Sequence, residues 1–218
     1  MTSQEVYFHE TYFYARKAYF YAKDVIQGRW PEGEPAIAIH PEWACWYAKY
    51  IIQGRWSEGE STILTNTYWA YIYAKYVVKG RWPEGESIIL TDPCWSYYYS
   101  RDIIQGRWPE GEPTIATHPE WAYRYALYIS NNRWPEGEPI ILTVPYWAYL
   151  YAIDVIQGRW PEAESIIATD PRYACFYAKH IIKCRWPEVE PIILQSVYAQ
   201  EYYKEFLQAK TNWQKDGF

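Results

Sequence analysis

The chain has 218 residues, of which 50% are hydrophobic, 21% are aromatic and 22% are charged. Disordered chains are poor in aromatic residues and rich in net charge, so this composition excludes intrinsic disorder. The net charge of −5 argues against nucleic acid as a partner, because it does not attract phosphate. No apolar run is long enough to cross a bilayer, so we expect no membrane contact.

The dipeptide Arg-Trp recurs seven times at strict intervals of 26 residues, from Arg29-Trp30 to Arg185-Trp186. A fixed period of this length is typical of repeat arrays, in which each copy packs mainly on its neighbours. The sequence therefore predicts an all-α solenoid of seven helix–loop–short-helix repeats, with a capping helix at each end. We divide it into an N-terminal capping helix (1–28), the array (29–195) and a C-terminal capping helix with a tail (196–218).

In chain order, residues 1–28 are expected to form one helix. Each copy then contains the loop Arg-Trp-Pro-Glu-Gly-Glu and a short helix, from Pro35 to Ile39 in the first copy. The proline at 35 recurs at 113, 139 and 191, and its ring prevents one helix from running through the loop. Six-residue helices are not stable alone, so neighbouring copies must hold them.

A long helix of about 13 residues follows. It begins at Pro41 or its equivalents, with capping residues such as Asp92 before several of these starts. We expect it to end on a left-handed glycine, as at Gly54. Cys184 replaces that glycine in the seventh copy, which predicts a cap that is strained or built differently. After Gln195 the pattern decays into a last amphipathic helix, with a loose tail over 211–218.

On a helical wheel, the positions of Trp43, Ala44, Tyr47, Ala48 and Ile51 share one arc of about 140°, and these positions repeat from copy to copy. We expect this arc to face the core. The opposite arc varies between copies and holds large rings and cations. Exposed aromatic strips are typical of interfaces, although self-association or tight curvature could bury the arc equally well. The candidate interface residues are Trp46, Lys49, Tyr50, Ile72, Lys75, Tyr76, Tyr98, Arg101, Arg124, Tyr128 and Phe176.

The block 21–34, Tyr-Ala-Lys-Asp-Val-Ile-Gln-Gly-Arg-Trp-Pro-Glu-Gly-Glu, resembles short Tyr/Trp-rich repeats of uncharacterised bacteriophage and bacterial proteins. The resemblance covers about residues 18–195. It implies a helical solenoid and a phage or prophage origin, and it brings no catalytic residue or ligand. Paired helices also give a looser similarity to TPR and Sel1-like repeats, although their period is longer.

The loop supplies a repeated set of Arg, Trp and Glu, which could form a charged ridge or a stacking platform for bases or sugars. Presence in all seven copies favours a structural role instead, in which each Arg bonds Glu carboxylates and each Trp packs over the loop with its indole N–H bonded locally. The residues of this ladder include Arg29, Trp30, Glu32, Glu34, Arg107, Trp108, Glu110 and Glu112.

No known nucleophile, phosphate-loop or metal-ligand spacing occurs, and the histidines at 9, 40, 118 and 180 are scattered. We therefore predict a protein that is not an enzyme, with no catalytic residue, no metal and no cofactor. The cysteines at 45, 94, 175 and 184 form no CxxC pair, and no signal-peptide pattern opens the chain. These features predict a cytoplasmic location, which would be the host cytoplasm for a phage-encoded protein.

Three functional hypotheses follow from the varied arc. The first is a protein-binding module for an unidentified partner, such as a phage-encoded inhibitor or adaptor of a host protein. The second is a structural protein that self-assembles, because repeat ends that stack can also form homo-oligomers. The third is a nucleic-acid or carbohydrate binder that uses the rings and the basic residues.

Overall fold

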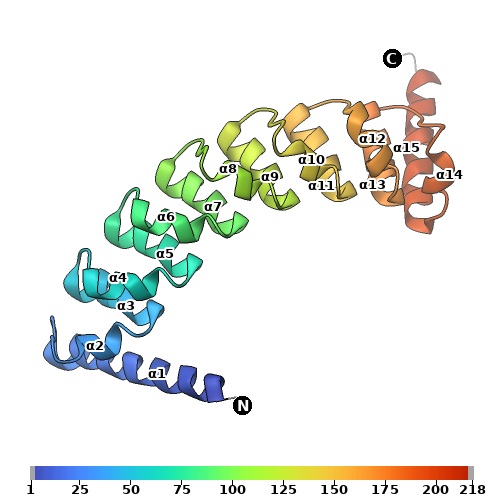
Figure 1. Cartoon of the computed structure of the whole chain (residues 1–218). Helices are drawn as coiled ribbons and strands as arrows, with labels where there is room; N and C mark the ends of the chain where they lie inside the picture. The colour runs from blue at the N-terminus through green and yellow to red at the C-terminus, as the bar shows by residue number, and fades with distance from the viewer. Residues whose placement is uncertain (1–2, 216–218) are drawn as a thin grey trace. The chain divides into compact units, whose positions relative to one another are not determined.

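The computed structural model describes the backbone of residues 3–215 and the side chains of residues 10–208. These residues form an all-helical α-solenoid without strands, as the period predicts (Figure 1). The chain divides into two compact units, Met1–Thr114 and Ile115–Phe218, each a stack of helical layers. The division falls inside the repeat array rather than at its ends, and the predicted boundaries after residues 28 and 195 stay predictions.

In the first unit, α1, α3 and α5 each pack on the short helix that follows and on the next long helix, so that α1, α3, α5 and α7 lie side by side (Figure 1). Each long helix is an α-helix that continues into a π-helix, labelled η. The elements are α1 (Ser3–Phe20), η1 (Tyr21–Ile26), α2 (Glu34–Ile37), α3 (Pro41–Tyr47), η2 (Ala48–Ile52), α4 (Ser57–Ile63), α5 (Thr67–Tyr73), η3 (Ala74–Val78), α6 (Pro83–Ile89), α7 (Pro93–Tyr99) and η4 (Ser100–Ile104).

The second unit repeats this plan, with α9, α11, α13 and α15 packed in succession. The short helix α8 (Glu112–Ile115) spans the boundary between the units. The other elements are α9 (Pro119–Tyr125), η5 (Ala126–Ser130), α10 (Glu138–Ile141), α11 (Pro145–Tyr151), η6 (Ala152–Ile156), α12 (Pro161–Ile167), α13 (Pro171–Tyr177), η7 (Ala178–Ile182), α14 (Glu190–Ile193) and α15 (Val197–Lys215). The expected loose tail is therefore wrong over 211–215, which are helical, and 216–218 lie outside the described residues.

The ends of the long helices differ from the prediction, because the left-handed residue precedes the glycine. Gln53 has φ 59°, and the N–H groups of Gln53 and Gly54 both bond the carbonyl of Ala48. A Cβ added at Gly54 would meet nothing within 4 Å, so a side chain fits there. The seventh copy accordingly places Lys183, not Cys184, at φ 59°, and the predicted strain at Cys184 is wrong.

The length of the short helices follows the predicted effect of proline. Helices with proline at the second position, such as α2 with Pro35, have four residues. Helices with serine at the same repeat position, such as α6 with Ser87, have seven and begin earlier, at Pro83. Proline has no N–H to bond the carbonyl of the preceding turn, so the loop carbonyl loses its helical partner. The predicted end at Ile39 is wrong, since α2 ends at Ile37.

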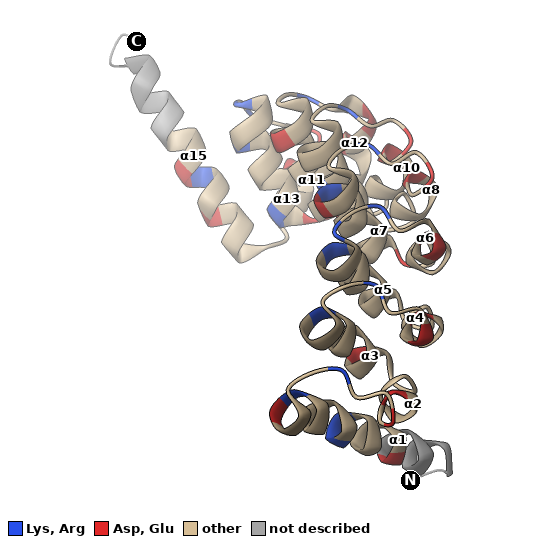
Figure 2. Cartoon of the chain, turned by 90° about the vertical axis from the view of Figure 1, so that its left-hand side faces the viewer, with Lys and Arg blue, Asp and Glu red and all other residues tan. Residues whose placement is uncertain are grey.

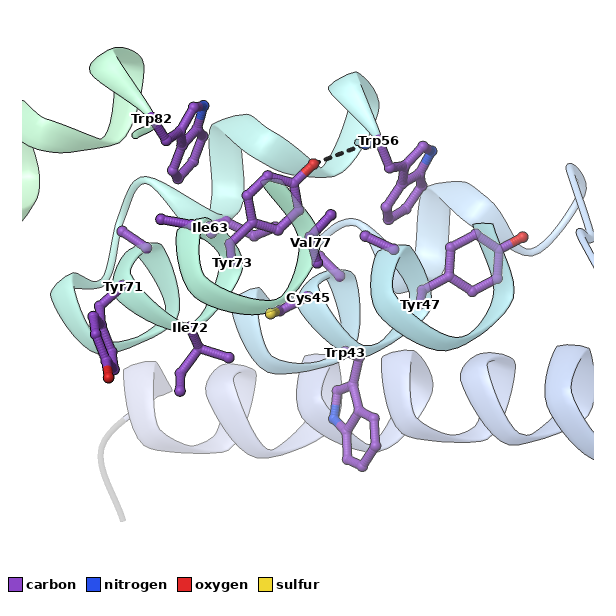
Figure 3. Packing of buried hydrophobic residues seen from close by; sticks show 14 of the residues in the cluster. Trp43, Cys45, Tyr47, Trp56, Ile63, Tyr71, Ile72, Tyr73, Val77 and Trp82 are labelled. Carbon is purple, nitrogen blue, oxygen red and sulfur yellow. Dashed lines mark hydrogen bonds between the residues drawn. The ribbon is translucent and has the colours of Figure 1, made fainter. Parts of the chain in front are cut away.

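The core contains one Tyr, one Trp and one Ile from each layer, as Figure 3 shows for Tyr73, Trp56 and Ile63 of the first unit. Alanines on the same face, such as Ala44 and Ala70, are fully buried, so the helices approach closely while the rings fill the space between them. Fully buried side chains of this size contribute about 1.5–3 kcal/mol each, and they hold short helices that are unstable alone.

Candidate functional site

The repeated tyrosine of a long helix bonds the loop that precedes the helix, and we term these hydrogen bonds the clasp. In the first unit, the Tyr73 hydroxyl accepts the backbone N–H of Trp56 at 2.8 Å and donates to Glu60 Oε1 at 2.8 Å. Trp30 and Glu34 bond Tyr47 in the same way, at 2.9 and 3.0 Å. The clasp therefore satisfies a buried backbone donor and holds the loop on the helix.

The Arg and Glu ladder has the predicted structural role. Arg29 binds Glu34 through two bonds of 2.7 and 3.1 Å, and Arg107 binds Glu112 through two bonds of 2.7 and 2.8 Å. In the first unit, the first Glu of a loop receives the Arg of the preceding copy, as in Arg55 to Glu84 at 3.1 Å and Arg81 to Glu110 at 3.3 Å. Glu32 of the first copy has no preceding loop and is exposed.

The ladder also contradicts one expectation about its tryptophans. The rings pack as predicted, for Trp82 and Trp108 are buried, with Tyr73 and Tyr99 against them at centroid distances of 4.9 and 4.8 Å. The expected local bond of the indole N–H is wrong for Trp82, whose Nε1 is buried without a partner in the described residues. The backbone N–H of Trp82, bound to Tyr99, is the bonded group.

The varied arc is more buried than the wheel predicts, because each long helix has a neighbouring layer on both sides. Position 45 and its equivalents belong to this arc, yet Cys45 and Tyr71 are only 0% and 5% exposed. Ile72, a candidate interface residue, is 7% exposed and lies in the core. Trp46 and Tyr98 are half-buried between layers. Ile72 is therefore wrong as a surface contact.

Pairs of residues that are 31 apart connect consecutive layers on this arc. The Tyr71 hydroxyl donates to Asp102 at 2.5 Å, and the Tyr123 hydroxyl donates to Asp154 at 2.6 Å. A third pair joins Tyr149 to His180 Nδ1 at 2.9 Å. The varied residues thus differ between copies partly because each layer must match the next one.

The exposed part of the arc in the first unit forms what we term the unit 1 strip, made of Trp46, Lys49, Tyr50, Lys75, Tyr76, Tyr98 and Arg101. Tyr50 and Tyr76 are 52% and 40% exposed. The Lys49 ammonium lies 5.1 Å from the ring centroid of Trp46, 4.9 Å from that of Tyr50 and 4.1 Å from that of Tyr76. These three rings stabilise the cation by cation–π attraction. Figure 2 shows blue Lys and Arg segments recurring along the long helices of this unit.

Asp102 pairs with the other two cations of the unit 1 strip. Lys75 Nζ lies 2.7 Å from its carboxylate, and Arg101 binds it through bonds of 2.5 and 3.1 Å. Burial alone would raise the pKa of Asp102, but the hydrogen bonds from Arg101, Lys75 and Tyr71 lower it well below its usual range. Burial alone would likewise lower the pKa of Lys75, but its bonds to Asp102 and Tyr71 raise it. Arg101 also lies over Tyr98, at 4.6 Å.

The second unit contains the remaining candidates, and they do not form one strip there. Arg124 binds Glu120 at 2.9 Å, one helical turn away. Tyr128 is 61% exposed. Phe176 is half-buried and packs against His180 and Tyr202, with ring centroids at 6.0 and 5.4 Å. Each candidate of this unit therefore has separate surroundings.

No protein-family model matches the chain. No curated protein or solved structure matches it either. The function must therefore be argued from the residues and their geometry alone.

In the part of the chain that the structure describes, no group of three or more His, Cys, Asp or Glu side chains could hold a metal ion. Within the same part, no helix combines the length and apolarity that crossing a bilayer requires. His40 is buried, and burial lowers its pKa. His118, at the same repeat position three copies later, is exposed, and His9 is outside the described side chains.

Sequence reasoning missed the residues that connect the layers: Tyr71, Asp102, Tyr123, Asp154, Tyr149 and His180. A signal for them was present. Residues that are 31 positions apart, which is one period of 26 plus five, pair a tyrosine with a carboxylate or imidazole acceptor in three places. The signal was missed because the wheel treats one helix at a time, whereas these pairs lie between helices.

Proposed function

We propose that the protein is a non-enzymatic binding module that binds a partner protein through the unit 1 strip. The observation that carries this proposal is the exposure of Tyr50 and Tyr76, from two consecutive layers, around Lys49. Tyrosine supplies a large contact area and loses little side-chain entropy when it is buried in an interface. The aromatic-rich helical surface is compatible with such a module.

The partner belongs to the compartment in which the chain is made. A reducing cytoplasm agrees with the state of the cysteines, for Cys45 and Cys175 are buried free thiols. If the chain is of phage origin, the partner is a host protein and the chain is its inhibitor or adaptor.

Self-assembly is the alternative, and the repeat register argues against its end-to-end form. Lys75 of one layer meets Asp102 of the next, and Asp24 holds the position of Asp102 in the first layer. At the other end, Glu205 of α15 holds the position of Lys75. Stacking two molecules in the repeat register would therefore oppose Asp24 and Glu205, both of which are exposed carboxylates.

Affinity capture with the pure protein tests the proposal. We expect the Tyr50→Ser, Tyr76→Ser double variant to lose a protein that the wild type retains, whereas Tyr198→Ser, a change of an exposed ring on α15, retains it. Quantitative mass spectrometry measures the retained protein. Equal capture by all three proteins would rule out the unit 1 strip as the binding surface.

A further inference from the structure

We infer that Lys23 and Lys49 form a site for two carboxylates of an extended acidic peptide, spaced three residues apart. The inference rests on the proposed function, since it names the chemistry that the strip recognises. Three layers of the same unit have a lysine at one repeat position, and of these Lys75 has an acidic partner, whereas Lys23 and Lys49 do not.

Lys75 shows how the fold satisfies a cation at this repeat position. Its ammonium binds Asp102 of the next layer at 2.7 Å and the hydroxyl of Tyr71 at 3.0 Å. Lys49 holds the same repeat position one layer earlier, but the residue of the next layer that corresponds to Asp102 is Tyr76. Lys49 therefore meets the face of a ring, at 4.1 Å, where Lys75 meets a carboxylate.

Lys23 repeats this situation one layer further toward the N-terminus. It is exposed and lies 5.8 Å from the ring centroid of Phe20, and Tyr50 of the next layer holds the position of Asp102. Among the described residues, neither Lys23 nor Lys49 has a carboxylate within 4.0 Å. Asp24, next to Lys23 in sequence, is exposed and makes no such contact. The two ammonium groups remain available to an acidic ligand.

The spacing of the layers determines the spacing of the ligand. Packed helices are about 8–10 Å apart, and a polyproline II chain advances about 3.1 Å per residue with three residues per turn, so equivalent lysines of two layers match carboxylates three residues apart on one side of the peptide. The rings of Trp46, Tyr50 and Tyr76 surround Lys49, and they favour apolar residues between the two acids. The motif that fits is Glu-Leu-Ala-Glu in polyproline II conformation.

A peptide fits better than a nucleic-acid strand. Single-stranded nucleic acid requires a row of cations along its backbone, but Lys75 and Arg101 already share the carboxylate of Asp102, which leaves these three side chains with a single net positive charge. Two free cations on a chain of net charge −5 match two carboxylates better than a run of phosphates.

Fluorescence anisotropy with three labelled peptides tests the inference. The probes contain Glu-Leu-Ala-Glu, the same core with both Glu changed to Gln, and the two Glu adjacent to each other, all flanked by Gly-Ser. Each exposed ion pair contributes about a two- to fivefold change in affinity, so wild type should bind the first probe about tenfold more tightly than the glutamine probe. The adjacent-Glu probe should bind with intermediate affinity, because it reaches only one lysine.

Two variants change the site by one side chain each. Tyr76→Asp places a carboxylate opposite Lys49, as Asp102 lies opposite Lys75, and Asp is native to this repeat position, although Cys45 stands here where Tyr71 donates to Asp102. Lys49→Gln removes the cation. Both should weaken binding of the first probe about two- to fivefold, while Lys204→Gln, a change of an exposed lysine on α15, should not alter it.

Three results would overturn the inference: no measurable binding of the first probe, equal binding of the glutamine probe, or displacement of the first probe by oligothymidylate at a lower concentration than by unlabelled peptide. None of these results changes the capture experiment with Tyr50→Ser and Tyr76→Ser. A strip that binds a protein without preference for carboxylates would refute the peptide chemistry and leave the proposed function standing. Loss of the capture difference would refute both.

Discussion

Replacing Tyr73 with Phe removes one hydroxyl from the clasp, and the structure gives the size of the effect. The hydroxyl is the bonding partner of the buried N–H of Trp56, and a buried donor left unpaired costs about 1–3 kcal/mol. Loss of the hydrogen bond to Glu60 costs less, because Arg55 still binds this carboxylate through two bonds of 2.8 Å. We expect a total loss of about 2–3 kcal/mol, or roughly 4–12 °C in the melting temperature for a chain of this length.

Tyr21→Phe is the matched control, because Tyr21 holds the same repeat position in the first layer. Its ring packs on Trp30 at 4.8 Å, as in other layers, but it is 44% exposed, and its hydroxyl makes no hydrogen bond within residues 10–208. We expect a change below about 0.5 kcal/mol, as for an ordinary surface substitution. Circular dichroism melts measure both variants, and amide exchange at Trp56 locates the effect, since repeat arrays can unfold in parts. Equal melting temperatures, or unchanged exchange at Trp56, would refute the clasp.

The clasp also predicts the response to alkali. Burial raises the pKa of Tyr73 above its usual value and that of Tyr47 to about 12. A phenol whose pKa is raised in the folded state contributes stability that is complete below about pH 10 and is lost as the pH rises above it. Wild type should therefore lose stability above about pH 10, and Tyr73→Phe should lose less, with tyrosinate absorbance rising in step with unfolding.

Three further predictions concern other residues. Gly80→Ala should change the unfolding free energy by less than about 0.5 kcal/mol in urea titrations, because its Cβ would meet nothing. Gly85→Ala should cost about 1 kcal/mol, because its Cβ would lie 2.2 Å from the Trp82 ring and that ring must shift; the cost stays at the low end for overpacking because Ala163 holds the same repeat position beside the buried Trp160. Equal costs would contradict the glycine assignment. Burial lowers the pKa of His180, so the stability that depends on neutral His180 should be present above about pH 6.5 and be lost as the pH falls below it. In two other layers, an Asp at this position accepts the hydrogen bond of the equivalent tyrosine, so the His180→Asp variant should fold. Melting temperatures at pH 5 and 7.5 should show a smaller loss of stability at the lower pH than in the wild type. An unchanged loss would mean that another group is responsible. Cys184 is the exposed cysteine among four free thiols, whereas burial raises the pKa of Cys45 to about 12 and that of Cys175 to about 11. Mass spectrometry after brief alkylation should therefore find Cys184 modified first. Earlier modification of Cys45 would refute the packing.

The period allowed much of the fold to be predicted from sequence, because identity between copies shows which positions the scaffold requires. The shortening of α2 by Pro35 and the cap that Asp92 forms, which accepts from Cys94 N at 2.8 Å, followed from the chemistry of single residues. The π-turns did not, since a widened helix end has no residue signature. Gly54 was assigned the left-handed conformation of Gln53 because propensity favours glycine there, yet the backbone places the turn one residue earlier.

The candidate site was predicted less well, for a reason of geometry. A wheel separates one helix into two faces, but an inner layer is covered on both sides, so Ile72 and Tyr71 are buried on the face that was expected to meet solvent. Tyr50 and Tyr76 were located correctly because they lie at the helix end, where the neighbouring layers leave the rings exposed. The acid that neutralises Lys75 was missed, because Asp102 belongs to another copy.

The pairs that are 31 residues apart bear on how such an array can change in length. Nearly identical copies invite loss or gain of one copy by recombination, which shifts every later layer by 26 residues. Excision of 54–79 would bring Asp102 against Cys45 instead of Tyr71, so the carboxylate would lose its phenol donor and the layer would lose a ring. The copies are therefore not interchangeable, and the variation between them favours one number and one order of layers.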